Sequence, residues 1–266
     1  MSRTEKRNPR TTNFSKESTV TMLEIINDEN MRSVRAVGDA IDDIAKAVDA
    51  VTEAFLKGGR LIYVGAGTSG RMAVMDAAEC PPTFGVDYNT VVTVMAGGKD
   101  AMFRASENIE DSAEAGKADL LLKDPTKLDV VMGISASGNA AYVEGAMLAA
   151  KELGCVTISL SSNEDCKIAK VAHIPIVTKT GAEVITGSTR MKAGNAQKFV
   201  LNMITTCSMV KTGKVYENLM INLRPTNIKL RKRMIGIVRD ILECDEEKAE
   251  ALLDANEWNI RKAVGE

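Results

Sequence analysis

Hydrophobic residues along this chain fall into two alternating patterns that together predict an α/β fold. Short, nearly continuous apolar runs are typical of strands covered on both faces, and they occupy residues 61–64, 91–95, 130–134, 155–160 and 174–177. Helical segments are expected between them, at residues 71–78, 100–122, 140–153 and 163–171, with a candidate break at Gly116. The alternation predicts a doubly wound parallel sheet, in which ligands bind at the carboxyl ends of the strands.

Helical spacing also dominates both ends of the chain. Residues 1–18 are polar and predict an arm, whereas apolar positions in residues 20–56 recur at the spacing of two helices. A later segment, 193–210, is apolar around most of its circumference, so we expect it to be buried centrally or at a subunit interface. Three further helices are expected at residues 228–242, 246–255 and 258–264. We therefore predict an N-terminal arm with helices (1–56), a sheet domain (57–225) and a C-terminal helical unit (226–266).

Composition narrows the class of protein. The 266 residues carry a net charge of -2, which argues against a nucleic-acid partner, because such partners need a basic surface. No apolar run approaches the roughly 20 residues of a membrane span, and the first residues lack the apolar core of a signal peptide. We expect a cytoplasmic protein with no membrane partner. The five cysteines are scattered and His173 is the single histidine, so a general acid or base is expected among carboxylates, Lys, Tyr or Cys.

A glycine-rich turn, residues 65–70, follows the first apolar run. Such a turn lets backbone N–H groups and a helix N-terminus converge on an anion, and Thr68 and Ser69 add hydroxyl groups. The turn also matches the G-x-G-x-x-G pattern of dinucleotide-binding proteins. That function needs an acidic residue at the end of the second strand, where this chain has Met95-Ala96-Gly97-Gly98. The hydroxyl groups instead favour a terminal phosphate.

Two more polar loops are candidate parts of a site: one follows the third apolar run, and the other precedes the predicted helix at residues 193–210. The first contains Ser135, Ser137 and Gly138 directly after the third run. Serine at such a position often only caps the helix, but two hydroxyl-rich loops at the ends of parallel strands favour a shared phosphate site. The second loop, residues 186–192, either contacts the substrate, orders a dimer or simply caps the next helix.

Two carboxylates accompany these loops. Glu79 comes directly before Cys80-Pro81-Pro82, where the prolines remove N–H donors and stiffen the backbone. Glu110 lies in a predicted helix, and by pattern alone it is a solvated residue for which Glu107 and Asp111 are equally good alternatives. A phosphate cradle followed by a fixed carboxylate suggests acid–base chemistry on a phosphorylated substrate.

Several long segments resemble the N-acetylmuramic acid 6-phosphate etherase family. They are GAGTSGRMAVMDAAECPPTFG, GISASG, EVITGSTRMKAGNAQKFVLNMI and GKVYENLMINLRPTN, and the resemblance extends over essentially the whole chain. It implies a sugar isomerase (SIS) domain, which the glucokinase regulatory protein shares. It also implies a lyase that cleaves the D-lactyl ether of N-acetylmuramic acid 6-phosphate to N-acetylglucosamine 6-phosphate and D-lactate, by elimination and hydration, in cell-wall sugar recycling. The family is cytoplasmic and homodimeric and uses no metal or other cofactor.

The same resemblance implies roles for individual residues. Glu79 corresponds to the acid that assists lactate departure and Glu110 to the base at C2, although the two roles could be reversed and the two residues could act from different subunits. The implied phosphate contacts are Thr68, Ser69, Ser135 and Ser137, with backbone access at Gly67, Gly70 and Gly138. Further substrate contacts are implied for Ser188, Thr189 and Lys192.

The chain departs from the family pattern at two places. It has Asn108-Ile109 where members often have a pair of small residues, and Ala140-Ala141 where they often have Thr-Pro. A non-catalytic phosphosugar-binding regulator would keep the phosphate loops without the acid and base, so the presence of both glutamates favours an enzyme. An aldose–ketose isomerase would share the enolisation but usually not the ECPPTFG segment. Residues 245–264 resemble a ubiquitin-associated unit, which we expect to pack structurally.

Overall fold

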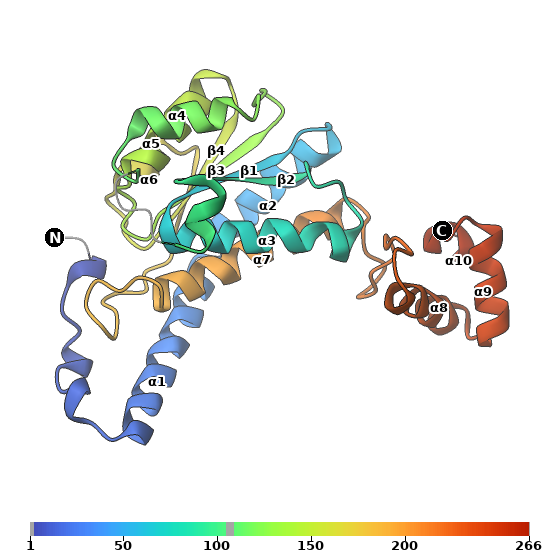
Figure 1. Ribbon diagram of the computed structural model, residues 1–266, viewed down its shortest axis with the longest axis horizontal. Helices are drawn as coiled ribbons and strands as arrows, with labels where there is room; N and C mark the ends of the chain where they lie inside the picture. Colours follow the sequence, from blue (N-terminus) through green and yellow to red (C-terminus); the bar gives the residue numbers. More distant parts are fainter. Residues whose placement is uncertain (1–2, 105–108, 266) are drawn as a thin grey trace.

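The structure, a computed structural model, describes residues 3–104 and 109–265 (Figure 1). Its centre is a five-stranded, all-parallel sheet with the strand order β2-β1-β3-β4-β5. The strands are β1 (Leu61–Gly65), β2 (Val91–Met95), β3 (Val130–Ile134), β4 (Val156–Ser161) and β5 (Ile174–Val177). These bounds agree with the predicted runs to within about one residue, so the doubly wound parallel sheet is confirmed.

Helices cover both faces of the sheet (Figure 1). One face packs on α2 (Ile41–Leu56), α3 (Gly67–Phe84) and α7 (Lys192–Lys211). The other face packs on α4 (Ala113–Leu121), α5 (Ala141–Glu152) and α6 (Lys167–Val171). In β1, Leu61 and Tyr63 join the first apolar core, and Ile62 and Val64 join the second. This alternation is why a strand buried on both faces needs an unbroken apolar run.

The N-terminal part reaches away from the sheet and returns to it (Figure 1). The two helices expected at residues 20–56 are confirmed as α1 (Thr19–Gly38) and α2, and Ser18 caps α1 by accepting a hydrogen bond from the N–H of Thr21. The preceding arm has three short turns, η1 (Arg3–Glu5), η2 (Pro9–Thr11) and η3 (Phe14–Lys16). Thr4, Asn8 and Thr11 are buried, so this polar arm is packed against the body of the protein.

The predicted helix at residues 100–122 is wrong. The structure has a short η4 (Gly98–Met102) and then α4, which begins only after Ser112 accepts a capping hydrogen bond from the N–H of Ala115. Gly116 is no break, because it lies inside α4. A Cβ atom there would lie 1.8 Å from the carbonyl oxygen of Tyr142, so this glycine allows α4 to approach α5 closely. Helix α6 also begins four residues later than predicted.

Helix α3 is longer than the predicted 71–78 at both ends. It includes Pro81 and Pro82 and stops at Gly85, which adopts a left-handed conformation with φ of 64°. A Cβ atom at Gly85 would lie 1.6 Å from the carbonyl oxygen of Asn222, whose amide in turn donates a hydrogen bond to the carbonyl of Phe84. The segment after α7 therefore packs against the end of α3.

The C-terminal helices form a separate group beside the end of α7 (Figure 1). This group has its own apolar core. Its helices are α8 (Ile228–Leu242), α9 (Glu246–Ala255) and α10 (Ile260–Val264), of which the first two have the predicted bounds. The core also takes in Ile221 and Leu223, which precede the predicted boundary, and the guanidinium of Arg231 lies 4.1 Å from the ring centroid of Trp258. The division of the chain at residues 56 and 225 stays a prediction. Among the described helices, none is long and apolar enough to cross a membrane.

Candidate functional site

A cavity of about 210 Å³ lies where β1 and β3 end. The strand order reverses between these two neighbours, and such a switch point is where open α/β sheets bind ligands. The cavity is lined by residues 66–69 after β1, by residues 134–137 at the end of β3, and by Glu5, Glu110, Ala140 and Thr189. Two of the three hydroxyl-rich loops that the sequence singled out therefore meet here, and one residue of the third loop joins them.

The first wall of the cavity is the start of α3. The helix begins at Gly67, so Thr68 and Ser69 lie in its first turn rather than in a loop before it, as the predicted start near Arg71 implied. The first N–H groups of a helix have no helical acceptor and carry partial positive charge. A Cβ atom at Gly70 would lie 2.9 Å from the carbonyl oxygen of Gly65, so glycine is needed where the helix crosses β1. The result is a set of N–H and O–H donors facing the cavity.

The second wall is the loop after β3. The hydroxyl of Ser135 accepts a hydrogen bond from the N–H of Gly138 at 3.1 Å, and the hydroxyl oxygens of Ser135 and Ser137 lie 3.4 Å apart. Gly138 has a φ of 74°, and a Cβ atom there would lie 2.2 Å from the sulfur of Cys166. The amide of Asn163 donates to the carbonyls of Ala136 and Ser137, which holds the loop in place.

Glu110 lies in a turn before α4, not in the helix that the sequence predicted. Its carbonyl oxygen accepts a hydrogen bond from the N–H of Tyr142 at 3.0 Å, at the start of α5. The hydroxyl of Tyr142 donates to Asp119 at 2.7 Å, and burial followed by this carboxylate raises the pKa of the tyrosine. The contact between α4 and α5 thus positions Glu110, which lines the cavity with its side chain exposed.

The sequence left Glu107 and Asp111 as alternatives to Glu110 for the catalytic carboxylate. Asp111 is exposed and does not line the cavity. Glu107 and Asn108 lie outside the described residues, so the structure does not test whether the Asn108-Ile109 pair narrows the pocket.

Glu79 lies elsewhere on α3. It is exposed and ten residues beyond Ser69, which corresponds to about 15 Å along a helix. It does not line the cavity, and its neighbours on the same helix face are Met75, Ala78 and Pro82, of which Met75 is 41% exposed. Within one chain, the two carboxylates predicted to be catalytic are therefore not brought together.

Of the other residues predicted to contact the substrate, some line the cavity and others do not. Thr189 lines the cavity, whereas Ser188 does not. Lys192 is fully buried, and its ammonium group pairs with Glu29 rather than facing the cavity. Glu5 lines the cavity although the sequence did not single it out, because its polar segment before the first helix carries no local signal of a site. Within the described ranges, no three His, Cys, Asp or Glu side chains are grouped so as to hold a metal ion.

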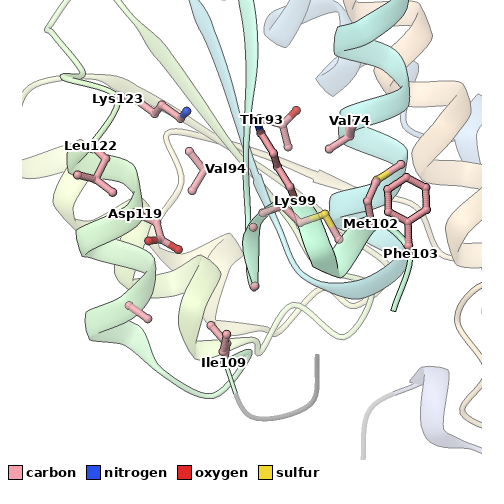
Figure 2. Close-up of a pocket in the computed structure, with 14 residues that line it drawn as sticks. Val74, Thr93, Val94, Lys99, Met102, Phe103, Ile109, Asp119, Leu122 and Lys123 are labelled. Carbon is pink, nitrogen blue, oxygen red and sulfur yellow. The ribbon is translucent and has the colours of Figure 1, made fainter. Parts of the chain in front are cut away.

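A roomier pocket of about 820 Å³ lies beside β2 (Figure 2). Its lining comes from α3, β2, η4 and α4 and is mostly apolar, with Val74, Val94, Met102 and Phe103 among the side chains drawn in Figure 2. None of the residues predicted to bind or convert a substrate lines it. The polar cavity at the switch point is therefore the candidate site, although it is the smaller of the two.

Comparison with known proteins agrees with this fold. Residues 43–151 match the model of the glucokinase regulatory protein N-terminal SIS domain. A phosphoheptose isomerase from Neisseria gonorrhoeae superposes with a TM-score of 0.52 at 20% identity, over 70% of this chain and 98% of that one, which supports the fold alone. A Bacteroides fragilis protein described as a phosphosugar isomerase gives a TM-score of 0.55 at 24% identity, over 72% and 91% of the two chains.

Sequence relatives are much closer. The N-acetylmuramic acid 6-phosphate etherase of Pasteurella multocida is 49% identical over 254 residues, which cover 95% of this chain and 84% of the relative. The enzyme of the same name from Clostridium beijerinckii is 48% identical over 261 residues, covering 98% and 86%. Because these relatives are nearly half identical to this chain over 95–98% of its length, the chain belongs to the N-acetylmuramic acid 6-phosphate etherase family.

Proposed function

We propose that this protein is a lyase that cleaves the D-lactyl ether of N-acetylmuramic acid 6-phosphate in cell-wall sugar recycling. The products are N-acetylglucosamine 6-phosphate and D-lactate. The observation that carries the proposal is the cavity at the switch point, which gathers Thr68, Ser69, Ser135 and Ser137 with the carboxylate of Glu110. The names of the relatives, at 47–49% identity over nearly the whole chain, support the same reaction.

The four hydroxyl groups and the first turn of α3 are suited to the 6-phosphate. Each hydroxyl can donate to a phosphate oxygen, and the N-terminus of a helix favours a negative charge. Among the described residues that line the cavity, there is no lysine or arginine. Recognition of the phosphate by this chain therefore relies on neutral donors and the helix end.

The carboxylates supply the acid–base chemistry. An alkyl ether is a poor leaving group, but the C1 aldehyde of the open-chain sugar acidifies the proton on C2. Glu110 takes that proton, the C–H electron pair forms the C2–C3 double bond, and the C3–O bond breaks as an acid protonates the departing lactate oxygen. Water then adds at C3 while a proton returns to C2. We assign the acid role to Glu79.

The distance of Glu79 from the cavity leads to a second part of the proposal. We infer that the protein is a homodimer in which Glu79 of each chain faces the cavity of the other. Large apolar side chains exposed on three helices support this, because a dimer interface would remove them from water. On α1, Val20 and Leu23 are 65% and 62% exposed, and Met75 on α3 and Met203 on α7 are 41% and 37% exposed. We further propose a cytoplasmic location for the dimer.

The experiment is lactate release from N-acetylmuramic acid 6-phosphate in D₂O, with mass analysis of the sugar. We expect D-lactate together with one deuterium at C2 of the product, because proton removal and return are both required. Glu110→Gln is the matched control, with neither lactate nor deuterium expected. Binding of the substrate without lactate or C2 exchange would contradict the proposal and favour the non-catalytic regulator.

A further inference from the structure

Glu5 brings a third carboxylate to the candidate site. It belongs to η1 of the N-terminal arm and lines the same cavity as Glu110 and the hydroxyls of Thr68 and Ser137. The reaction proposed above gives it no role. A negative charge at a cavity for a phosphorylated ligand is unfavourable unless it meets a hydrogen-bond donor, so the position needs a chemical reason.

The arm before Glu5 is attached to the second phosphate loop. The backbone N–H of Arg3 donates to the side-chain oxygen of Asn163 at 2.8 Å. The amide nitrogen of the same Asn163 donates to the carbonyl oxygens of Ala136 and Ser137 at 3.1 and 3.2 Å. One side chain therefore sets the distance between the arm and the loop that carries Ser137.

The arm after Glu5 is attached to the segment that precedes α7. The side-chain amide of Asn8 donates to the carbonyl of Ala182 at 3.2 Å, and the hydroxyl of Thr11 donates to the carbonyl of Val184 at 2.9 Å. Both side chains are buried. Because Glu5 lies between two attachment points, the fold sets the position of its backbone at the cavity, and its exposed side chain lines the cavity from there.

The loop that carries Thr189 leaves space for this carboxylate. A Cβ atom at Gly187 would lie 3.2 Å from Oε2 of Glu5, and Gly187 adopts a φ of 78° that disfavours other residues. The carboxylate thus lies against the backbone of the loop while its oxygens remain accessible from the cavity.

We propose that Glu5 binds the sugar part of the ligand by accepting hydrogen bonds from hydroxyl groups of the hexose phosphate. This inference rests on the proposed function for its ligand class. An ionised carboxylate can only accept hydrogen bonds, and sugar hydroxyls are donors, whereas a phosphate dianion is repelled. Glu5 therefore receives the polyhydroxyl end of the ligand, and the phosphate lies at the first turn of α3. The arm is part of the binding site.

The test compares two ligands, of which only the sugar phosphate should bind more weakly to the variant. Calorimetric titration of wild type and Glu5→Gln with N-acetylglucosamine 6-phosphate should show affinity about tenfold weaker in the variant, because a charge-assisted hydrogen bond is lost. Titration with inorganic phosphate should show equal or tighter binding in the variant, since a repulsive charge is gone. A role in folding alone would move both affinities in the same direction.

Two further variants serve as controls for the effect of Glu5→Gln. Glu24→Gln, an exposed glutamate on α1 away from the cavity, should bind both ligands as wild type does. Glu5→Asp keeps the charge on a shorter side chain and should recover part of the affinity for the sugar phosphate. If Glu5→Gln binds the sugar phosphate as tightly as wild type, or weakens both ligands equally, the inference is wrong.

The experiments distinguish a wrong role for Glu5 from a wrong proposed function. If wild type releases no lactate but still binds the sugar phosphate more tightly than Glu5→Gln does, the etherase activity is wrong and the role of Glu5 stands. If wild type releases lactate and the variant shows an unchanged KM with a lowered kcat, Glu5 acts in the chemistry and the binding role is wrong.

Discussion

Lys192, at the start of α7, forms an ion pair with Glu29 on α1, and the two side chains are 0% and 3% exposed. Glu29 also accepts hydrogen bonds from Nε of Arg10 at 2.6 Å and from the amide of Asn8 at 3.0 Å. Three segments distant in the sequence therefore meet at one buried carboxylate. Because the arm carries Glu5 and the segment before α7 carries Thr189, we propose that this pair holds two walls of the cavity together.

The pair makes stability depend on pH. Burial alone would raise the pKa of Glu29, but hydrogen bonds from Arg10 and Lys192 outweigh it and lower the pKa from 4.5 to about 2. The ionised carboxylate therefore adds stability above its unfolded-state pKa, and this stability is lost as the pH falls toward 2. We expect Glu29→Gln to lower the free energy of unfolding at pH 7 by about 3–5 kcal/mol, because Lys192 stays buried without its charge partner.

Urea unfolding at a series of pH values measures this effect. The loss of stability between about pH 5 and pH 3 should be smaller in Glu29→Gln than in wild type. Glu24→Gln, an exposed glutamate on the same helix, should stay within about 0.5 kcal/mol of wild type at every pH. If the free energy of unfolding falls equally steeply with decreasing pH in wild type and in Glu29→Gln, this ion pair does not control stability in acid.

The two candidate catalytic glutamates can be tested together. Glu79→Gln and Glu110→Gln should each lower turnover by about 10²-fold or more, as expected for an acid–base group. If each site takes Glu110 from one chain and Glu79 from its partner, a mixed dimer of the two variants has one intact site. Refolding an equal mixture should then restore about one quarter of wild-type activity, since half of the dimers are mixed and each has one such site.

The same mixture distinguishes a shared site from a single-chain site. Each variant refolded alone should stay inactive, and Glu114→Gln, an exposed residue of α4 outside the cavity, should be as active as wild type. Mixed dimers that form but stay inactive would mean that Glu79 does not act across subunits.

Ser69 should affect substrate binding more than turnover. Its side chain lies in the first turn of α3 at the cavity, where it would hold the phosphate equally in the ground and transition states. We expect Ser69→Ala to raise KM by about tenfold or more with little change in kcat, because a hydrogen bond to a charged group is lost. Ser15→Ala, in the exposed part of the arm, is the control. A lowered kcat with unchanged KM would argue against phosphate binding by Ser69.

Gly116 should be intolerant of any side chain. A Cβ atom there would lie 1.8 Å from the carbonyl oxygen of Tyr142, and a backbone atom inside α5 has little freedom to move. We expect Gly116→Ala to destabilise the protein by about 1–3 kcal/mol or more through overpacking. It should also lower activity, since the N–H of Tyr142 binds the carbonyl of Glu110.

The control is a second helical glycine. Gly38, in α1, has no atom within 4 Å of the position that a Cβ would take, so Gly38→Ala should change stability by at most about 0.5 kcal/mol. Thermal unfolding of both variants measures the difference. Equal stability of the two would mean that α4 and α5 can separate without cost.

Several elements followed from local sequence because local rules dictate them. A strand buried on both faces needs an apolar run, so β1 to β5 were predicted almost to the residue. The rule that parallel strands end at one edge also predicted that the loops after β1 and β3 would meet, and the cavity lies between them. The catalytic and binding roles of the individual residues stay predictions until the variants above are measured.

Two of the failures arise because the deciding contact is distant in the sequence. The segment 100–122 has helical spacing, but the turn that presents Glu110 to the cavity is held by the hydrogen bond from the N–H of Tyr142, at the start of α5, to the carbonyl of Glu110. The sequence alone predicts a break at Gly116, because only the neighbouring helix shows that α4 must approach the backbone of Tyr142 closely at this residue.

The sequence by itself determined the sheet, the helices that cover it, the phosphate-type loops and the family, since each depends on patterns within a few residues or on long shared segments. Only the tertiary structure decided that Glu5 joins the cavity, that Lys192 is buried against Glu29, and that Glu79 lies outside the single-chain cavity. These are relations between residues that meet only after the chain has folded, and burial and charge pairing across such distances leave no periodic signal in the sequence.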